Sequence, residues 1–160
     1  MINHFILNSE SLDVLVRLGV AMLCGTLLGV ERVISHKSAG MRTYALVAMG
    51  AALFVTIGDL VIGRYASGSF DPVHIMSAII SGVGFMCAGV IIFKDTSVTG
   101  LTTASGLWVA AGIGIACGLH LFTLAIIASL LSLFVLVVLW YVEQGIKYIA
   151  HKIDPEEKNQ

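Results

Sequence analysis

Long runs of hydrophobic residues with few charges dominate the chain. A helix that crosses a bilayer needs about 20 mostly apolar residues, and three such runs precede Asp95. Residues 96–142 then contain no Asp, Glu, Lys or Arg. As one helix this stretch would be about 70 Å long, so it must turn back once, and Gly118 marks the turn. The pattern predicts five spanning helices at about residues 12–30, 44–63, 73–93, 101–117 and 121–142.

The composition also indicates a membrane protein. The hydrophobic fraction is 58%, the charged fraction is 12% and the mean hydropathy is +0.96. A soluble domain usually carries about twice that charged fraction. We predict an all-α membrane protein with a five-helix transmembrane domain at residues 12–142, preceded by an outer segment (1–11) and followed by a cytoplasmic tail (143–160). From this composition we expect the lipid bilayer as a partner. Because the net charge is −1, we do not expect nucleic acid as a partner.

The lysines and arginines predict the orientation, because cytoplasmic loops of membrane proteins carry more of them than outer loops. With the N-terminus outside, seven of the eight Lys and Arg residues outside the predicted spans fall on the cytoplasmic side. Only Arg64 falls on the outer side. The sequence therefore predicts an N-out, C-in topology.

One cation, Arg17, lies inside a predicted span, about five residues from its outer end. Asp59 lies about four residues from the outer end of the second span, at a similar depth. A lone charge at mid-bilayer costs about 2.5–3.5 kcal/mol on insertion scales, and pairing lowers that cost. We predict an intramembrane ion pair between Arg17 and Asp59, joined by Asp13 one turn before Arg17. A structural clamp, snorkelling to the interface and a functional polar pocket are the open interpretations.

A second group of polar residues is expected at the cytoplasmic ends of the spans. Glu31 and Arg32 end the first span, and Arg42 precedes the second. The loop after the third span returns further carboxylate and hydroxyl groups to the same depth. We expect Arg42 to bridge carboxylates there through its planar guanidinium, with an ordinary loop surface as the alternative. The candidate site comprises Glu31, Arg32, Arg42, Asp95, Thr102 and Thr103.

Small residues recur at four-residue spacing in several spans. Residues four apart lie on nearly the same face of a helix, so each set lets a neighbouring backbone approach closely. These stripes indicate packing within the chain, or a face for a homo-oligomer or a partner. The glycines assigned to helix packing are Gly25, Gly29, Gly82, Gly84, Gly89, Gly106 and Gly114.

The cysteines and histidines carry little signal. The three cysteines lie in predicted spans and suit small apolar packing better than disulfides. His4, His74 and His120 would share the outer side with Asp71. A metal or proton-sensing site there is one interpretation, and solvated interface histidines are the other. No ligand or nucleophile–base spacing is present, so we expect no metal, no cofactor and no enzymatic activity.

Several segments, taken together, are typical of one protein family. They are Arg17–Leu18, Gly25–Arg32, Ala39–Phe54, Ser81–Phe85, Ala88–Ile91, Gly100–Ala104 and Leu107–Ala111. In order and spacing, over about residues 12–117, they resemble the MgtC/SapB family of bacterial inner-membrane proteins. Cys87 stands where the family usually has Gly, and Thr99 where an Arg is common. Longer family members end in an ACT-like domain, and the about 18 residues after Val142 are too few to form one.

The resemblance implies a non-enzymatic, multi-pass protein of the bacterial inner membrane. It implies a role in adaptation to low magnesium, to acid or to life inside host cells, where it supports virulence. The implied mode of action is the modulation of other inner-membrane proteins. The alternative is a small ion channel or transporter whose polar path is lined by Arg17 and Asp59.

Overall fold

The computed structural model describes residues 9–65, 71–94 and 97–153. In this part of the chain there are five helices, each long and apolar enough to cross a membrane, which confirms the predicted five-span fold. The side of the membrane on which each end lies stays a prediction. The helices are α1 (Ser9–Ile34), α2 (Met41–Tyr65), α3 (Pro72–Val90), α4 (Leu101–Gly118) and α5 (Phe122–Ile153).

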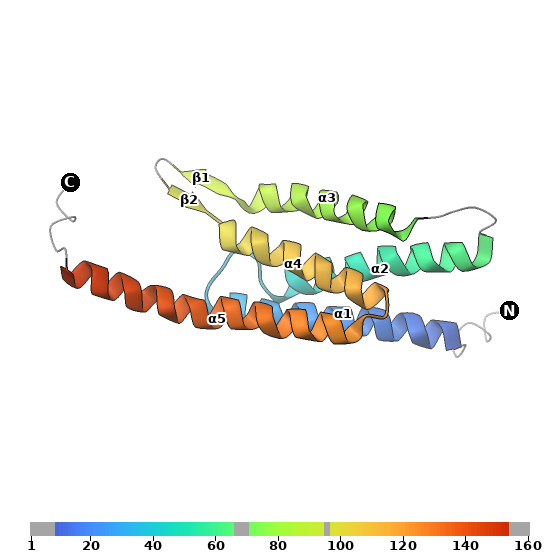
Figure 1. Cartoon of the computed structure of the whole chain (residues 1–160). Helices are drawn as coiled ribbons and strands as arrows, with labels where there is room; N and C mark the ends of the chain where they lie inside the picture. The colour runs from blue at the N-terminus through green and yellow to red at the C-terminus, as the bar shows by residue number, and fades with distance from the viewer. Residues whose placement is uncertain (1–8, 66–70, 95–96, 154–160) are drawn as a thin grey trace.

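The helices do not contribute equally to the bundle. α1, α2 and α4 pack closely on one another, α5 lies against α1 and α4, and α3 packs on α4 and less on α2 (Figure 1). α4 is therefore the central helix, and most of its residues from Ala110 to Gly118 are buried. α3 and α5 expose most of their surface to the surroundings.

Glycines set the close approach of α1, α2 and α4. A Cβ atom at Gly25 would lie 2.5 Å from the Tyr44 carbonyl oxygen, and one at Gly114 would overlap the Ala48 carbonyl. Lipid tails are as apolar as leucine, so membrane helices associate through such close contacts more than through hydrophobic burial. Any side chain at these two glycines would push the helices apart.

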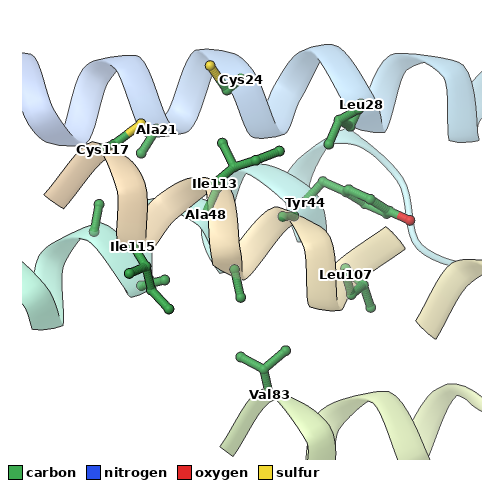
Figure 2. Close-up of a cluster of buried hydrophobic side chains, with 14 of the residues drawn as sticks. Ala21, Cys24, Leu28, Tyr44, Ala48, Val83, Leu107, Ile113, Ile115 and Cys117 are labelled. Atoms are coloured by element: carbon green, nitrogen blue, oxygen red, sulfur yellow. The ribbon is translucent and has the colours of Figure 1, made fainter. Parts of the chain in front are cut away.

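The buried side chains between these helices are mostly small. Figure 2 shows Ala21 of α1 next to Cys117 of α4, Ala48 of α2 next to Ile113, and Val83 as the contribution of α3. Many of the fully buried positions are alanines, and the larger members fill the gaps between the helices. The larger buried side chains labelled there are Leu28, Tyr44, Leu107, Ile113 and Ile115.

The connection from α3 to α4 differs from the prediction. The third span was expected to reach residue 93, but α3 ends at Val90 and a short antiparallel hairpin follows, β1 (Ile92–Lys94) and β2 (Ser97–Thr99). Ile, Phe, Val and Thr favour strands over helix. Gly100 then has φ +92°, and a Cβ atom there would overlap the Val90 carbonyl, so only glycine fits this turn.

The last helix is longer than the expected span. α5 continues past Val142 to Ile153, so that the segment assigned to a tail begins as helix. Glu143 and Lys147 form an ion pair one turn apart on its exposed surface, with Glu on the N-terminal side as this pairing prefers. Figure 1 shows this end of α5 extending beyond the other helices, on the side of the bundle where the hairpin lies.

Candidate functional site

The first polar centre surrounds Arg17, which is only 6% exposed. Its Nε donates to Asp13 Oδ2 at 2.9 Å, and its Nη1 donates to Asp59 Oδ2 at 2.7 Å. The same Nη1 lies 2.8 Å from the carbonyl oxygen of Gly118 and donates to it as well. The guanidinium therefore joins α1, α2 and the end of α4. We call Arg17, Asp13, Asp59 and the Gly118 carbonyl the Arg17 cluster.

The contact with Gly118 has a clear electrostatic basis. The last carbonyls of a helix lack partners within the helix and carry a partial negative charge, so a cation at this end is favourable. Gly118 is the last residue of α4. The two carboxylates are less enclosed than the guanidinium, because the side chains of Asp13 and Asp59 are 38% and 54% exposed.

His120 lies beside this cluster. Its Nε2 is 3.4 Å from Asp13 Oδ2, the oxygen that already accepts from Arg17. The histidines and the aspartate proposed from sequence to share one side do not gather here: Asp71 caps the start of α3 by accepting from the Val73 amide. His4 lies outside the described residues. Within the described part of the chain no three metal-binding side chains come together.

The second polar centre surrounds Arg32 at the other end of α1. Arg32 Nη1 lies 3.3 Å from Glu31 Oε2, and its Nη2 donates to Thr103 Oγ1 at 3.3 Å. Ser35 Oγ donates to Glu31 Oε1 at 2.6 Å, and the Tyr44 hydroxyl donates to the Thr103 carbonyl at 3.3 Å. These five residues are the Arg32 cluster, which ties the end of α1 to the starts of α2 and α4.

Four of the five residues of the Arg32 cluster are buried, and Ser35 is partly exposed. Arg32 and Glu31 are 2% and 8% exposed, and Tyr44 is fully buried. Gly106 makes room for the tyrosine, since a Cβ atom there would overlap the phenol oxygen. Within the described residues, Arg32 Nε is a buried donor with no hydrogen-bond partner. The charges are thus paired with each other but incompletely satisfied.

Two residues predicted for this site lie apart from it. Arg42 is exposed and forms no ion pair with Glu31 or with any other described carboxylate. Arg42 comes two residues before the buried Tyr44, about 200° away around the helix, and so faces outward. Thr102 is exposed for the same reason, one residue from the buried Thr103. Asp95 lies outside the described residues.

The predicted glycine stripes separate into two sets. Gly25, Gly29, Gly106 and Gly114 each contact another helix or the turn before it. In α3, by contrast, a Cβ atom on any of the predicted glycines would meet no described atom within 4 Å outside the neighbouring turns of its own helix. These three are Gly82, Gly84 and Gly89. The neighbouring Phe85 is 84% exposed, so this face of α3 is open in the chain by itself.

Sequence reasoning missed two members of the Arg32 cluster, Ser35 and Tyr44, and the position of His120 beside the Arg17 cluster. Ser35 lies one turn after Glu31, and this spacing was the available signal for its hydrogen bond. Tyr44 carries no sequence signal for its inward direction beyond its place among small residues. His120 was considered for the outer side, but its approach to Asp13 depends on the geometry of the α4–α5 turn.

Comparison with known proteins identifies the relatives of this chain. The model of the MgtC family matches residues 18–144. Protein slr0014 of Synechocystis is 41% identical over 74% of this chain and 49% of its own length. "Putative magnesium transporter YhiD" of Escherichia coli K12 is 36% identical over 72% of this chain and 55% of its own length. "Protein MgtC" of Brucella abortus strain 2308 is 45% identical over 52% of this chain and 33% of its own length.

These comparisons agree with the five apolar helices in describing a multi-pass membrane protein. No solved structure matches the chain. The chain spans about half, or less, of the length of these curated relatives. The matched region covers α2, α3 and α4 completely and contains the whole Arg32 cluster, and it begins one residue after Arg17. The chain therefore belongs to the MgtC family.

Proposed function

We propose that this chain is a non-enzymatic protein of the bacterial inner membrane that modulates other membrane proteins. Its role is adaptation to low magnesium, to acid or to life inside host cells. The family match supports this proposal, as does the resemblance in the segments around Arg17, Arg32 and Thr103. In this proposal the N-terminus lies outside the cell, so that the Arg32 cluster lies at the cytoplasmic face.

The observation that carries the proposal is the contrast between the closed core and the open face of α3. In the core, Gly25 and Gly114 bring backbones together, and Arg17 is fixed by three acceptors on three helices. A rigid, closely packed core suits a scaffold better than a conduction path. The open face of α3 offers Gly84 and Phe85 to another transmembrane helix, since small residues allow close helix approach.

The first experiment tests the α3 face by growth. A strain that lacks its own MgtC-family gene is complemented in low-magnesium medium with this chain, with Gly84→Leu or with Gly112→Leu. Both glycines lie in spanning helices, and a Cβ atom at either would meet open space, so both variants should insert and accumulate. We expect Gly84→Leu to lose growth rescue and Gly112→Leu to keep it. Equal rescue by the two variants would remove α3 as the working face.

The second candidate function is magnesium transport, which one relative carries in its name. The half-exposed carboxylate of Asp59 favours it. Against it, the buried guanidinium of Arg17 would repel a divalent cation at the same depth. Purified protein in sealed vesicles distinguishes the two: we expect magnesium flux equal to that of protein-free vesicles. Flux that disappears in Asp59→Asn would establish the transporter instead.

A further inference from the structure

The turn between α4 and α5 holds His120 in a fixed position. His120 has φ 61°, a left-handed conformation that is uncommon for residues other than glycine. Its amide donates to the Cys117 carbonyl at 3.1 Å, and the Leu121 amide donates to the Ala116 carbonyl at 2.8 Å. These bonds end α4 tightly and place the imidazole over α1, with its Nε2 3.4 Å from Asp13 Oδ2.

The charged groups around His120 come from three helices. α1 contributes Asp13 and Arg17, α2 contributes Asp59 through its bond to Arg17, and α4 contributes the Gly118 carbonyl. From α5 the uncharged ring of Phe122 lies edge-on at 5.7 Å between centroids, and the first charged residue of α5 is Glu143, about six turns further on. Glu10 lies one turn before Asp13 on α1 and has interactions of its own.

While the imidazole is neutral, the negative charges of this group outnumber the positive charges. Arg17 then faces two carboxylates, Asp13 and Asp59, and the cluster has an excess of one negative charge. The distance of 3.4 Å from His120 to Asp13 is longer than a firm N–H···O hydrogen bond. Protonation of the imidazole would give two cations for two carboxylates and a charged donor for Asp13.

We propose that His120 is a proton-operated clamp between the α4–α5 turn and α1. The protonated imidazole donates to Asp13 and draws the turn onto α1. With the neutral imidazole, this end of α4 is hydrogen-bonded to α1 through Arg17 and the Gly118 carbonyl. The imidazolium would lie beside two groups that attract a cation, the Asp13 carboxylate and the C-terminal end of α4. An imidazole ordinarily gains its proton near pH 6.5, within the range of acid stress.

The direction of the pH effect follows from the pairing. The contact with Asp13 exists only in the folded protein and only with the protonated ring. The stabilisation is therefore fully present at acid pH and is lost as the pH rises. Carboxyl groups in general titrate at lower pH than imidazoles, so the range from about pH 5.5 to about pH 7.5 is chosen to report on histidine.

Thermal unfolding of the full chain in lipid nanodiscs tests the clamp. Between pH 7.5 and 5.5 the wild-type midpoint should rise by about 1–3 °C relative to that of His120→Asn, the value expected for a half-exposed ion pair in a domain of this size. Asparagine is chosen because it tolerates the left-handed conformation. His36→Asn is the matched control: His36 has φ 52°, is exposed and forms no ion pair with the described residues. It should keep the wild-type pH response.

Two further variants keep the test decisive if His120→Asn does not fold. His120→Lys supplies a permanent charge near Asp13, so its midpoint should lack the response seen in the wild type over the same pH range. Asp13→Asn removes the acceptor and should also abolish this response. A wild-type pH response in His120→Asn, or in both of these variants, would overturn the proposal.

Discussion

The two buried arginines of α1 perform similar tasks with different surroundings. Arg17 and Arg32 lie 15 residues apart, about 22 Å along the helix axis. Each pairs with an acidic residue of α1, and each reaches one end of α4, Arg17 at the Gly118 carbonyl and Arg32 at the Thr103 hydroxyl. The central helix is thus held at both ends by α1.

The difference lies in how each arginine's partners are exposed. Arg17 has three acceptors at 2.7–2.9 Å, but its carboxylate partners are 38% and 54% exposed. Arg32 has longer contacts, both at 3.3 Å, and a carboxylate partner, Glu31, that is almost fully buried. Water can therefore replace Arg17 at its two carboxylate partners but cannot replace Arg32 at Glu31. We therefore expect the burial of the partner, and not the number of hydrogen bonds, to decide which arginine contributes more to the free energy of unfolding.

The largest expected effect is therefore at Arg32. Arg32→Met keeps most of the volume but leaves Glu31 buried with only the Ser35 hydroxyl. Breaking a buried pair in this way should lower the free energy of unfolding by about 3–5 kcal/mol. The measurement is unfolding by SDS titration in mixed micelles. Arg42→Met, at an exposed position on the next helix, is the control and should change it by less than about 0.5 kcal/mol.

A double variant separates pairing from packing at this site. In Glu31→Gln with Arg32→Met no carboxylate stays behind, so the loss should be smaller than for Arg32→Met alone. A loss for Arg32→Met that is smaller than the loss for Arg17→Met would break the ranking by burial. It would mean that the count of hydrogen bonds decides.

The next effect is the coupling between Arg17 and Asp59. Because Asp59 is half exposed, water screens the pair, and the coupling in a double-mutant cycle of Arg17→Met and Asp59→Asn should be about 1–2 kcal/mol. The same SDS titration gives the four free energies of the cycle. The charge swap Arg17→Asp with Asp59→Arg should partly restore folded yield. Strict additivity of the two single losses would contradict a direct pair.

The five spanning helices could be predicted from the sequence. Runs without charges fix where a chain crosses the bilayer, so five spans could be counted. The equal depth of Arg17 and Asp59, 42 positions apart, also follows from counting along antiparallel helices. Depth is readable because the bilayer imposes the same thickness on every span.

The sequence did not show in the same way which face of each helix points into the bundle. Arg42 and Arg32 lie at similar depth, but only Arg32 faces α4, because Tyr44 and not Arg42 fills the inner face of α2. The glycine stripes did not identify the inward face either, because α3 carries such a stripe and no described residue packs on it. In a membrane helix both faces are apolar, so the hydrophobic pattern carries little information about which face is inside.

The smallest effect tests rotation directly at two adjacent threonines. Thr103 is buried and accepts from Arg32, whereas Thr102 is exposed. Thr103→Val keeps the shape but removes one acceptor from a guanidinium that already has an unpaired Nε, and should cost about 0.5–1.5 kcal/mol. Thr102→Val should change the free energy of unfolding by less than about 0.5 kcal/mol. Valine and threonine are both β-branched, so helix propensity does not separate the variants. Equal losses at the two positions would mean that α4 is rotated from the orientation described, and that Arg32 finds its partner elsewhere.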